Sequence, residues 1–293
     1  MSSLTSSLRT FSNKTRPAVK MGILAAVLFG VGIGDLFASP LKVGVATMPT
    51  NGVLDIVVAK AKEQGLDVKI VEFSDWSTPN IAVSNGDLDL NYFQHQPFLE
   101  DSINKAGYKL VAVGLGYSTT NGIYSKKIKN ISELKDGAKI AIASDAINTG
   151  RALSLLQEAG LLKLKDNVGY LATVADIVDN PKSLKILQVD GPQISRALDD
   201  LDAAVTYPAF AKLGGLDPNT PVVLEKPNDL YALRFVTRPD RTNDARIQQF
   251  IRIYQTTPEV KETLKKYYGN VISFPWEKEQ ASSTSGAASA VAK

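Results

Sequence analysis

The stretch LKVGVATMPTNGVLDIVVAKAKEQGLDVKIVEF, residues 41–73, decides the fold class. Its first six residues, Leu41–Ala46, alternate between apolar and polar or small side chains, as a half-buried strand does. A helical pattern follows from about Val53 to Glu63, and Gly65 is placed to end it. Val68–Phe73 has the composition of a second strand. The order strand, helix, strand predicts an α/β fold.

Strands and helices continue to alternate along the chain. Further strands are expected at Leu88–Leu90, Lys109–Val113, Ile140–Ile142, Leu184–Val189, Ala203–Val205 and Tyr231–Thr237. Helices are expected at Thr78–Asn85, from Pro97, and at Gly150–Ala159, Pro192–Leu198, Ala245–Tyr254 and Pro258–Tyr268. Such an order predicts a mostly parallel sheet with helices on both faces.

Two cycles of this alternation predict two lobes. The segment Asp87–Phe93 resembles Asp200–Tyr207, and each is followed by a proline and an aromatic residue. The similarity fits two related units, although two α/β units that share turn residues by chance would show it as well. We expect a bilobal fold of two α/β lobes joined by a hinge, which the chain crosses near residues 118 and 228. The expected parts are a first lobe of 39–117 plus 229–276, a second lobe of 118–228 and a disordered tail of 277–293.

Residues 1–38 have the features of a secretory signal peptide. Four basic side chains and a single acidic one accompany an apolar run, Met21–Ile33, which leads to small residues near Ala38 and Ser39. A retained membrane anchor is the alternative, but the run is glycine-rich and shorter than the roughly 20 apolar residues that span a bilayer. We therefore expect export to the periplasm and removal of this segment.

The composition argues against several classes of function. Without residues 1–38, the 33 basic and 30 acidic side chains become 29 of each, so no excess charge favours a nucleic-acid partner. The absence of cysteine excludes disulfides, thiolate metal sites and a lipid-modified cysteine. A single histidine argues against a zinc cluster. No G-x-S-x-G, P-loop or H-E-x-x-H motif occurs, so we expect no metal, no cofactor and no enzymatic activity.

The single histidine, His95, lies in the aromatic segment Tyr92–Phe98, between a predicted strand and a predicted helix. In open α/β sheets such a junction is where ligands bind. Aromatic side chains around an imidazole suit an apolar ligand with a polar head. A structural loop histidine among core aromatics explains the segment equally well.

A second candidate site is Asp145–Arg151. Asn148 or Thr149 is placed to cap the helix expected at Gly150, which puts Arg151 in the first helical turn. The helix dipole disfavours a cation there unless an anion joins it, and guanidinium binds a carboxylate through two hydrogen bonds. The alternative is that Arg151 extends to solvent or pairs with Asp145.

Several motifs resemble the NlpA/MetQ family of methionine-binding proteins of ABC importers. The similarity runs from about Leu41 to Tyr268. The matching segments include Pro79-Asn80, Phe93-Gln-His-x-Pro-Phe98, Gly107–Gly114, Tyr124–Lys129, Asn148-x-Gly-Arg151, Gly160–Asp166, Asn180-Pro-Lys182 and Arg196–Asp200. Together they are far more specific than a single short motif.

The resemblance implies a bilobal periplasmic-binding-protein fold of type 2, with its ligand in the cleft between the lobes. It implies that aromatic side chains and the histidine of the FQH motif line a thioether pocket and that the arginine of the NxGR motif holds a carboxylate. It also implies an ABC permease and ATPase as partners. The residues expected to line the ligand site are Trp76, Phe93, His95, Phe98, Asn148, Arg151, Tyr207 and Tyr231.

Three departures from the family pattern bear on the ligand. The lipid-bearing cysteine is missing, and Tyr207 and Leu233 stand where the family has asparagines that hold the ligand's amino group and carboxylate. We expect a monomeric binding protein that captures methionine or a related carboxylate, with L-methionine itself in doubt. The alternatives are binding of a different organic acid, a surface interaction protein, or a periplasmic enzyme that uses the same cleft.

Overall fold

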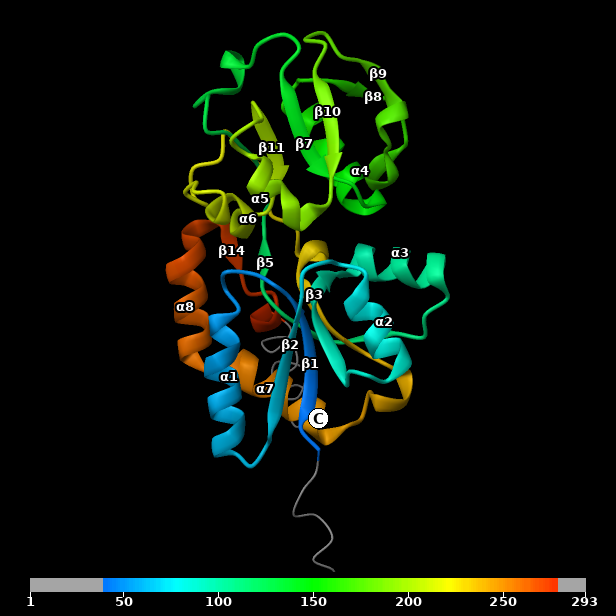
Figure 1. Cartoon of the computed structure of the whole chain (residues 1–293), viewed down its shortest axis with the longest axis vertical. Coiled ribbons are helices and arrows are strands. Elements are labelled where there is room, and N and C mark those ends of the chain that lie inside the picture. Colours follow the sequence, from blue (N-terminus) through cyan, green and yellow to red (C-terminus); the bar gives the residue numbers. More distant parts are fainter. Residues whose placement is uncertain (1–38, 279–293) are drawn as a thin grey trace, which may run out of the picture. The chain divides into compact units, whose positions relative to one another are not determined.

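The computed structural model describes residues 39–278 of the chain (Figure 1). The expected signal peptide and nearly all of the expected tail lie outside this part. Residues 39–278 belong to one compact unit. Within them, no helix has the length and apolar character needed to cross a membrane.

The described chain alternates between strands and helices. The strands are β1 Leu41–Ala46, β2 Val68–Phe73, β3 Leu90–His95, β4 Val111–Leu115, β5 Ser118–Thr119, β6 Gly122–Tyr124, β7 Lys139–Ala143, β8 Lys163–Leu164, β9 Ile177–Asp179, β10 Lys185–Val189, β11 Ala203–Thr206, β12 Val223–Leu224, β13 Leu233–Thr237 and β14 Ile272–Ser273. The helices are α1 Gly52–Glu63, α2 Thr78–Asn85, α3 Gln96–Ala106, α4 Ala146–Glu158, α5 Ile194–Ala197, α6 Pro208–Leu213, α7 Ala245–Thr256 and α8 Pro258–Tyr268.

Two five-stranded sheets organise the molecule. The first has the order β2-β1-β3-β13-β4 and the second the order β10-β7-β11-β6-β12. In each sheet four strands run in the same direction and one is reversed: β13 is antiparallel to β3 and β4, and β6 is antiparallel to β11 and β12. The expected mostly parallel sheets and the two-lobed α/β fold are therefore confirmed. β13 returns the chain to the first sheet after the second sheet is complete.

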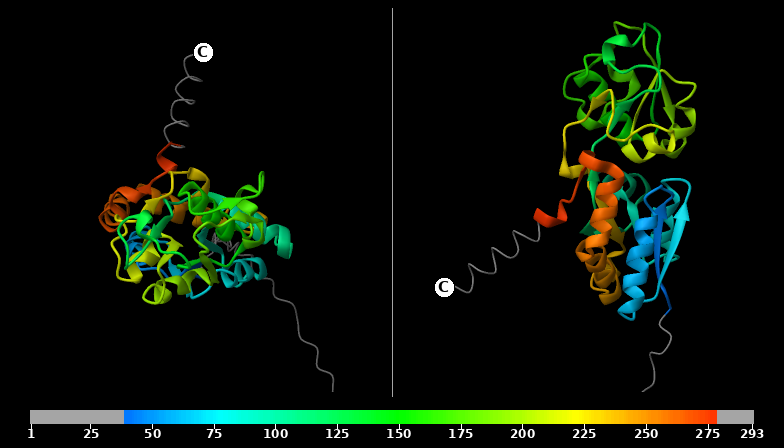
Figure 2. Two further views of the ribbon diagram at one scale, coloured as in Figure 1. Left: turned by 90° about the horizontal axis from the view of Figure 1, so that it is seen from above. Right: turned by 90° about the vertical axis from the view of Figure 1, so that its left-hand side faces the viewer.

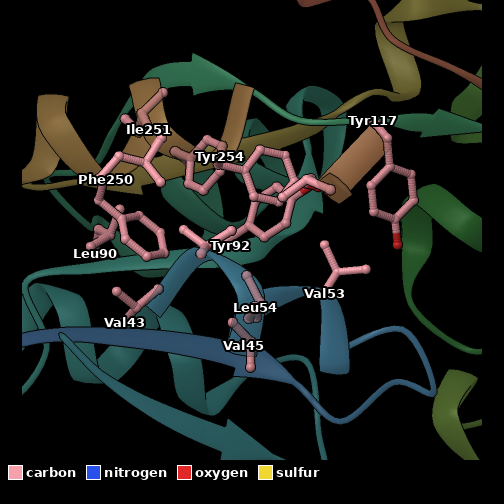
Figure 3. Close-up of a cluster of buried hydrophobic side chains, with 14 of the residues drawn as sticks. Val43, Val45, Val53, Leu54, Leu90, Tyr92, Tyr117, Phe250, Ile251 and Tyr254 are labelled. Atoms are coloured by element: carbon pink, nitrogen blue, oxygen red, sulfur yellow. The ribbon is translucent and has the colours of Figure 1, made fainter. Parts of the chain in front are cut away.

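The core of the first lobe lies between its sheet and the helices α1, α7 and α8, which lie on one side of the sheet (Figures 1 and 2). Val43 and Val45 of β1 contribute to it because alternate side chains of a strand point to the same face. Figure 3 shows Tyr92 near the centre of this cluster, where its ring stacks on Phe235 at 4.2 Å and its hydroxyl lies 2.8 Å from that of Tyr254. The opposite face of the sheet packs on α2 and α3 through a second, smaller cluster.

The second lobe is built in the same way. Ile140 and Ile142 of β7 pack against α4, while the intervening Ala141 packs on the other face against Ile194 of α5. Full burial of an aliphatic side chain of this size stabilises a fold by about 1.5–3 kcal/mol. β7 is a central strand of its sheet and both of its faces are buried. Its short sequence is therefore continuously apolar.

Five predicted elements differ from the structure. The helix expected at Pro192–Leu198 is a 3-10 turn, Gly191–Gln193, followed by the four-residue helix α5. The strand expected at Leu88–Leu90 is wrong, because the strand is β3 and runs on to His95 with every residue buried. Its polar residues Asn91 and Gln94 are buried through hydrogen bonds to Asn80, so the strand lacks an apolar pattern. The strand expected at Lys109–Val113 is shifted two residues later, to β4.

The other two differences concern the candidate site. The helix expected to begin at Gly150 begins at Ala146, and its N-cap is Asp145, whose side chain accepts from the backbone N–H of Asn148. The capping role expected of Asn148 or Thr149 is therefore wrong, and Arg151 does not lie in the first turn. Tyr231 was expected in a strand but ends a 3-10 turn just before β13.

Candidate ligand-binding site

A cavity of about 50 Å³ lies between residues of the two sheets. The third strands of both sheets, β3 and β11, lead into it, since His95 ends β3 and Tyr207 follows β11 directly. Both residues are N-caps of the helix that follows. The ends of parallel strands are the usual ligand-binding edge of an α/β sheet. The lining residues are Ala46, Met48, Trp76, Phe93, Gln94, His95, Phe98, Tyr117, Thr119, Asn148, Tyr207, Ala209, Phe210, Tyr231, Leu233 and Tyr268.

Aromatic rings form one wall of this cavity. Trp76, in the loop between β2 and α2, lies 6.4 Å from Phe98, 6.2 Å from Tyr207 and 6.0 Å from Phe210, measured between ring centroids. Phe93 meets Phe98 edge-on at 5.9 Å. Edge-to-face pairs at these distances are favourable arrangements of aromatic side chains. The wall is suited to the apolar part of a small molecule.

His95 is held in one neutral tautomer. Its Nδ1 accepts from the backbone N–H of Phe98 at 3.2 Å, so the proton lies on Nε2, which is 3.3 Å from Oδ1 of Asn148. Burial, and then the positive charge of Arg151, lower the pKa of His95 to about 3. The imidazole is therefore uncharged at neutral pH.

Asn148 joins the histidine to the start of α4. Its amide nitrogen donates to both carboxylate oxygens of Asp145, at 3.1 and 3.0 Å. Its Oδ1 accepts from the hydroxyl of Tyr207 at 2.9 Å. Asp145 thus both caps the helix and orients the amide, so that the amide oxygen points toward His95 and Tyr207.

Arg151 forms a buried ion pair with Glu225. Nε and Nη2 of the guanidinium lie 2.8 and 2.5 Å from the two carboxylate oxygens, and Nη1 lies 3.2 Å from the hydroxyl of Tyr207. The side chains are 2% and 14% exposed. The ring of Tyr231 covers the guanidinium at 3.6 Å, a cation–π distance. Burial lowers the pKa of Arg151, but its interactions with Tyr207 and Glu225 outweigh burial and raise it.

This pairing differs from the two alternatives to a bound anion that the sequence offered for Arg151. The side chain neither extends to solvent nor pairs with Asp145, and it is not part of the cavity lining. Glu225 was missed because it follows the two-residue strand β12, 74 positions from Arg151, and no local pattern marks it. The helix-dipole argument for an anion beside Arg151 does not apply, because the residue lies beyond the first turn of α4.

The other seven expected site residues all line the cavity, where their contact with a ligand stays a prediction. Sequence reasoning missed several lining residues, among them Met48, Gln94 and Phe210. Phe210 could have been found from the similarity of Asp87–Phe93 and Asp200–Tyr207, since a proline and then an aromatic residue follow each segment. Gln94 belongs to the Phe93-Gln-His motif, but its burial could not be foreseen, because it depends on amide hydrogen bonds to Asn80 and Asn91.

The cavity offers a small molecule aromatic contacts and a few hydrogen-bonding groups. Between residues 39 and 278, no group of three His, Cys, Asp or Glu side chains is placed to hold a metal ion. Charged groups next to the cavity wall, among them Arg151, Glu225, Asp145 and Arg234, are hydrogen-bonded within the protein. Two α/β lobes, an aromatic wall and an internally satisfied polar end define a two-lobed ligand-binding protein.

Comparisons with known proteins identify the family. The model of the NlpA lipoprotein family matches residues 41–275. The D-methionine-binding lipoprotein MetQ of Escherichia coli K12 is 41% identical over 262 residues, which are 88% of this chain and 96% of the relative. The chain belongs to the NlpA lipoprotein family, as its motifs predicted.

Solved structures agree with this assignment. A nutrient binding protein from Burkholderia cenocepacia bound to methionine is 41% identical, with a TM-score of 0.76 over 80% of this chain and 99% of that one. A periplasmic substrate-binding protein of an ABC transporter from Coxiella burnetii is 39% identical, with a TM-score of 0.75 and the same coverage of both chains. The chain is a binding protein and not an enzyme.

Proposed function

We propose that this protein is the substrate-binding protein of an ABC importer and captures a small, partly apolar molecule in the cavity between its lobes. The observation that supports this most strongly is the partly open aromatic cavity whose lining comes from both lobes. A site that takes residues from two lobes is suited to capture and release, because separation of the lobes opens it. The relatives described as methionine-binding and as part of an ABC transporter support the same role.

The ligand that the family suggests is methionine or a related small molecule with the same apolar chain. Trp76, Phe93 and Phe98 would enclose the apolar part, while His95 and Asn148 lie at the polar end. The relative that is bound to methionine supports a ligand of this size and shape.

The lobes that we propose are residues 39–117 plus 229–276 and residues 118–228, with hinge crossings near 118 and 228. The place of β13 in the first sheet supports the return of the chain to the first lobe. The short pairing of β5 with β14 lies at the first crossing. The partners would be a permease and an ATPase, and the protein would act as a monomer in the periplasm.

Calorimetric titration of ligand-stripped protein with L-methionine, D-methionine and their uncharged and carboxylate analogues tests the proposal. We expect at least one of these compounds to bind with a Kd of 10 μM or tighter, an affinity of about −7 kcal/mol. Phe98→Ala, in the cavity wall, should weaken that binding, whereas Leu213→Ala, at a side chain that is 53% exposed, should not. Binding that survives unchanged in Phe98→Ala would place the site elsewhere.

A further inference from the structure

The polar end of the cavity is occupied by the protein's own side chains. Arg151 has three nitrogen groups that donate, and each has a partner within the protein. Nε and Nη2 face Glu225, and Nη1 donates to the hydroxyl of Tyr207. A ligand carboxylate that bound Arg151 from the cavity would need the position of that hydroxyl, because Tyr207 lines the cavity and Arg151 does not.

The hydroxyl of Tyr207 closes a continuous hydrogen-bond network. It accepts from Arg151 and donates to Oδ1 of Asn148, whose amide nitrogen donates to Asp145. Burial raises the pKa of Tyr207 although the positive charge of Arg151 lowers it, so the phenol stays protonated and able to donate. Glu225 is also satisfied, since its Oε2 accepts from the backbone N–H of Asn121 at 2.9 Å.

The charged side chains at this end of the site are held by hydrogen bonds within the protein: Asp145 accepts from the amide of Asn148, and Arg234 donates to the backbone oxygen of Ala232. Arg151 and Glu225 form one neutral pair, and His95 is uncharged. Among the described residues that line the cavity, there is no aspartate, glutamate, lysine or arginine. A carboxylate or ammonium group entering the cavity would lose its hydration without gaining an opposite charge, which is strongly unfavourable. A neutral hydroxyl or carbonyl group has a much smaller desolvation penalty.

We infer that Tyr207 determines ligand specificity and that the ligand is uncharged: an apolar chain or ring with one neutral hydrogen-bonding group. The phenol oxygen takes the place of a ligand carboxylate on Arg151, and Leu233 adds an apolar surface to the same cavity. The inference rests on the proposed ligand-binding function and names the class of molecule that the site accepts.

The test compares three probes that share one thioether chain and differ in the charge of the head. They are 3-(methylthio)propan-1-ol, which is neutral, 3-(methylthio)propanoate, which is an anion, and L-methionine, which is a zwitterion. Calorimetry on the ligand-stripped protein should show the alcohol binding at least roughly 10-fold more tightly than either charged probe. In Tyr207→Asn, Nη1 of Arg151 loses its phenol partner, and the affinity for the propanoate should rise roughly 10- to 100-fold, as expected for a hydrogen bond between charged groups.

Tyr170→Asn is the matched control, because it makes the same change at a side chain that is 48% exposed and outside the cavity lining. It should leave the order of the three affinities unchanged, and the thermal unfolding midpoint of each variant shows that it is folded. Tighter binding of L-methionine or the propanoate than of the alcohol by the unchanged protein would overturn the inference and leave the proposed function intact. An unchanged order of affinities in a folded Tyr207→Asn would overturn the role of Tyr207. Binding of no probe by either protein would overturn both the inference and the proposed function.

Discussion

At the scale of single residues, the buried pair of Arg151 and Glu225 dominates the electrostatics of the site. Both side chains have given up most of their contact with water, so each charge depends on the other for its stabilisation. The stacked ring of Tyr231 and the hydroxyl of Tyr207 complete the shell around the guanidinium. Removal of one partner therefore leaves an uncompensated charge inside the protein.

We predict that Glu225→Gln lowers the free energy of unfolding by about 3 kcal/mol, since one buried charge then lacks its partner. The double variant Arg151→Met/Glu225→Met should lose less than the sum of the two single changes, because both charges are removed together. Urea unfolding of the unchanged protein, Arg151→Met, Glu225→Met and the double variant measures this coupling. Strictly additive losses would show that the two charges do not depend on each other.

His95 should make stability depend on pH. Its pKa is about 3 in the folded protein and about 6.5 when unfolded, so the unfolded state binds more protons between these values. The contribution of the neutral His95 to the free energy of unfolding is fully present above pH 6.5 and is lost as the pH falls toward 3. The slope is at most about 1.4 kcal/mol per pH unit.

His95→Asn isolates this contribution, because asparagine keeps a side-chain acceptor at the N-cap of α3. The variant should lose less stability than the unchanged protein between pH 6.5 and 4.5 in urea unfolding. Asp145, whose pKa burial raises, works in the opposite direction and loses stabilisation as the pH rises, but it is present in both proteins. Identical pH profiles would show that His95 is not neutral and buried as described.

At the scale of elements, α4 is held against the 3-10 turn Gly169–Leu171. A Cβ at Gly150 would lie 2.0 Å from the backbone oxygen of Tyr170, so the two segments approach each other through the bare backbone of glycine. This approach orients the helix that carries Asn148 and Arg151. The glycine of the NxGR motif therefore has a packing role beside its two functional neighbours.

We predict that Gly150→Ala destabilises the protein by roughly 1–3 kcal/mol, because the added methyl group meets backbone that cannot move away without distortion. Gly52→Ala is the matched control. It lies at the start of α1 with no atom near an added Cβ, and it should be neutral or stabilise by up to about 1 kcal/mol through helix propensity. Thermal unfolding separates the two; equal effects would contradict the close approach.

At the scale of the whole molecule, Trp76 connects the two lobes. It follows β2 of the first sheet, yet its ring packs beside Tyr207 and Phe210, which follow β11 of the second. A Cβ at Gly191 would lie 2.1 Å from Cη2 of Trp76. The tryptophan therefore lines the cavity and also packs on the apolar cluster of the second lobe.

We predict that Gly191→Ala weakens ligand binding by roughly 10-fold, a change of about 1.4 kcal/mol, because the added methyl group displaces the Trp76 ring from its place in the cavity wall. Trp76 packs only on the edge of the second lobe's apolar cluster and is itself partly exposed, so the thermal unfolding midpoint should stay within a few degrees of that of the unchanged protein. Calorimetry with the tightest probe, together with thermal unfolding, measures both effects. A large loss of thermal stability would show that Gly191 belongs to the folding core instead.

The sequence by itself determined the α/β class, the position of most strands and helices, and the family. It could do so because these features leave local signals: a periodic apolar pattern, a glycine at the end of a helix and a proline at its start all lie within a few residues of the element that they predict. Helices α2 and α8 have the bounds expected from Thr78–Asn85 and Pro258–Tyr268. It also indicated seven of the residues that line the cavity, because the aromatic segment around His95 and the resemblance to the NlpA/MetQ family pointed to them.

Only the tertiary structure decided how the charged side chains of the site are paired. The partner of Arg151 is Glu225, which reaches it from a two-residue strand far along the chain. The fully buried strand β3 was misplaced for a related reason: its polar residues are satisfied by amides of other elements. Whether a buried polar group is free for a ligand or already hydrogen-bonded depends on residues distant in sequence, and no local pattern encodes those pairings.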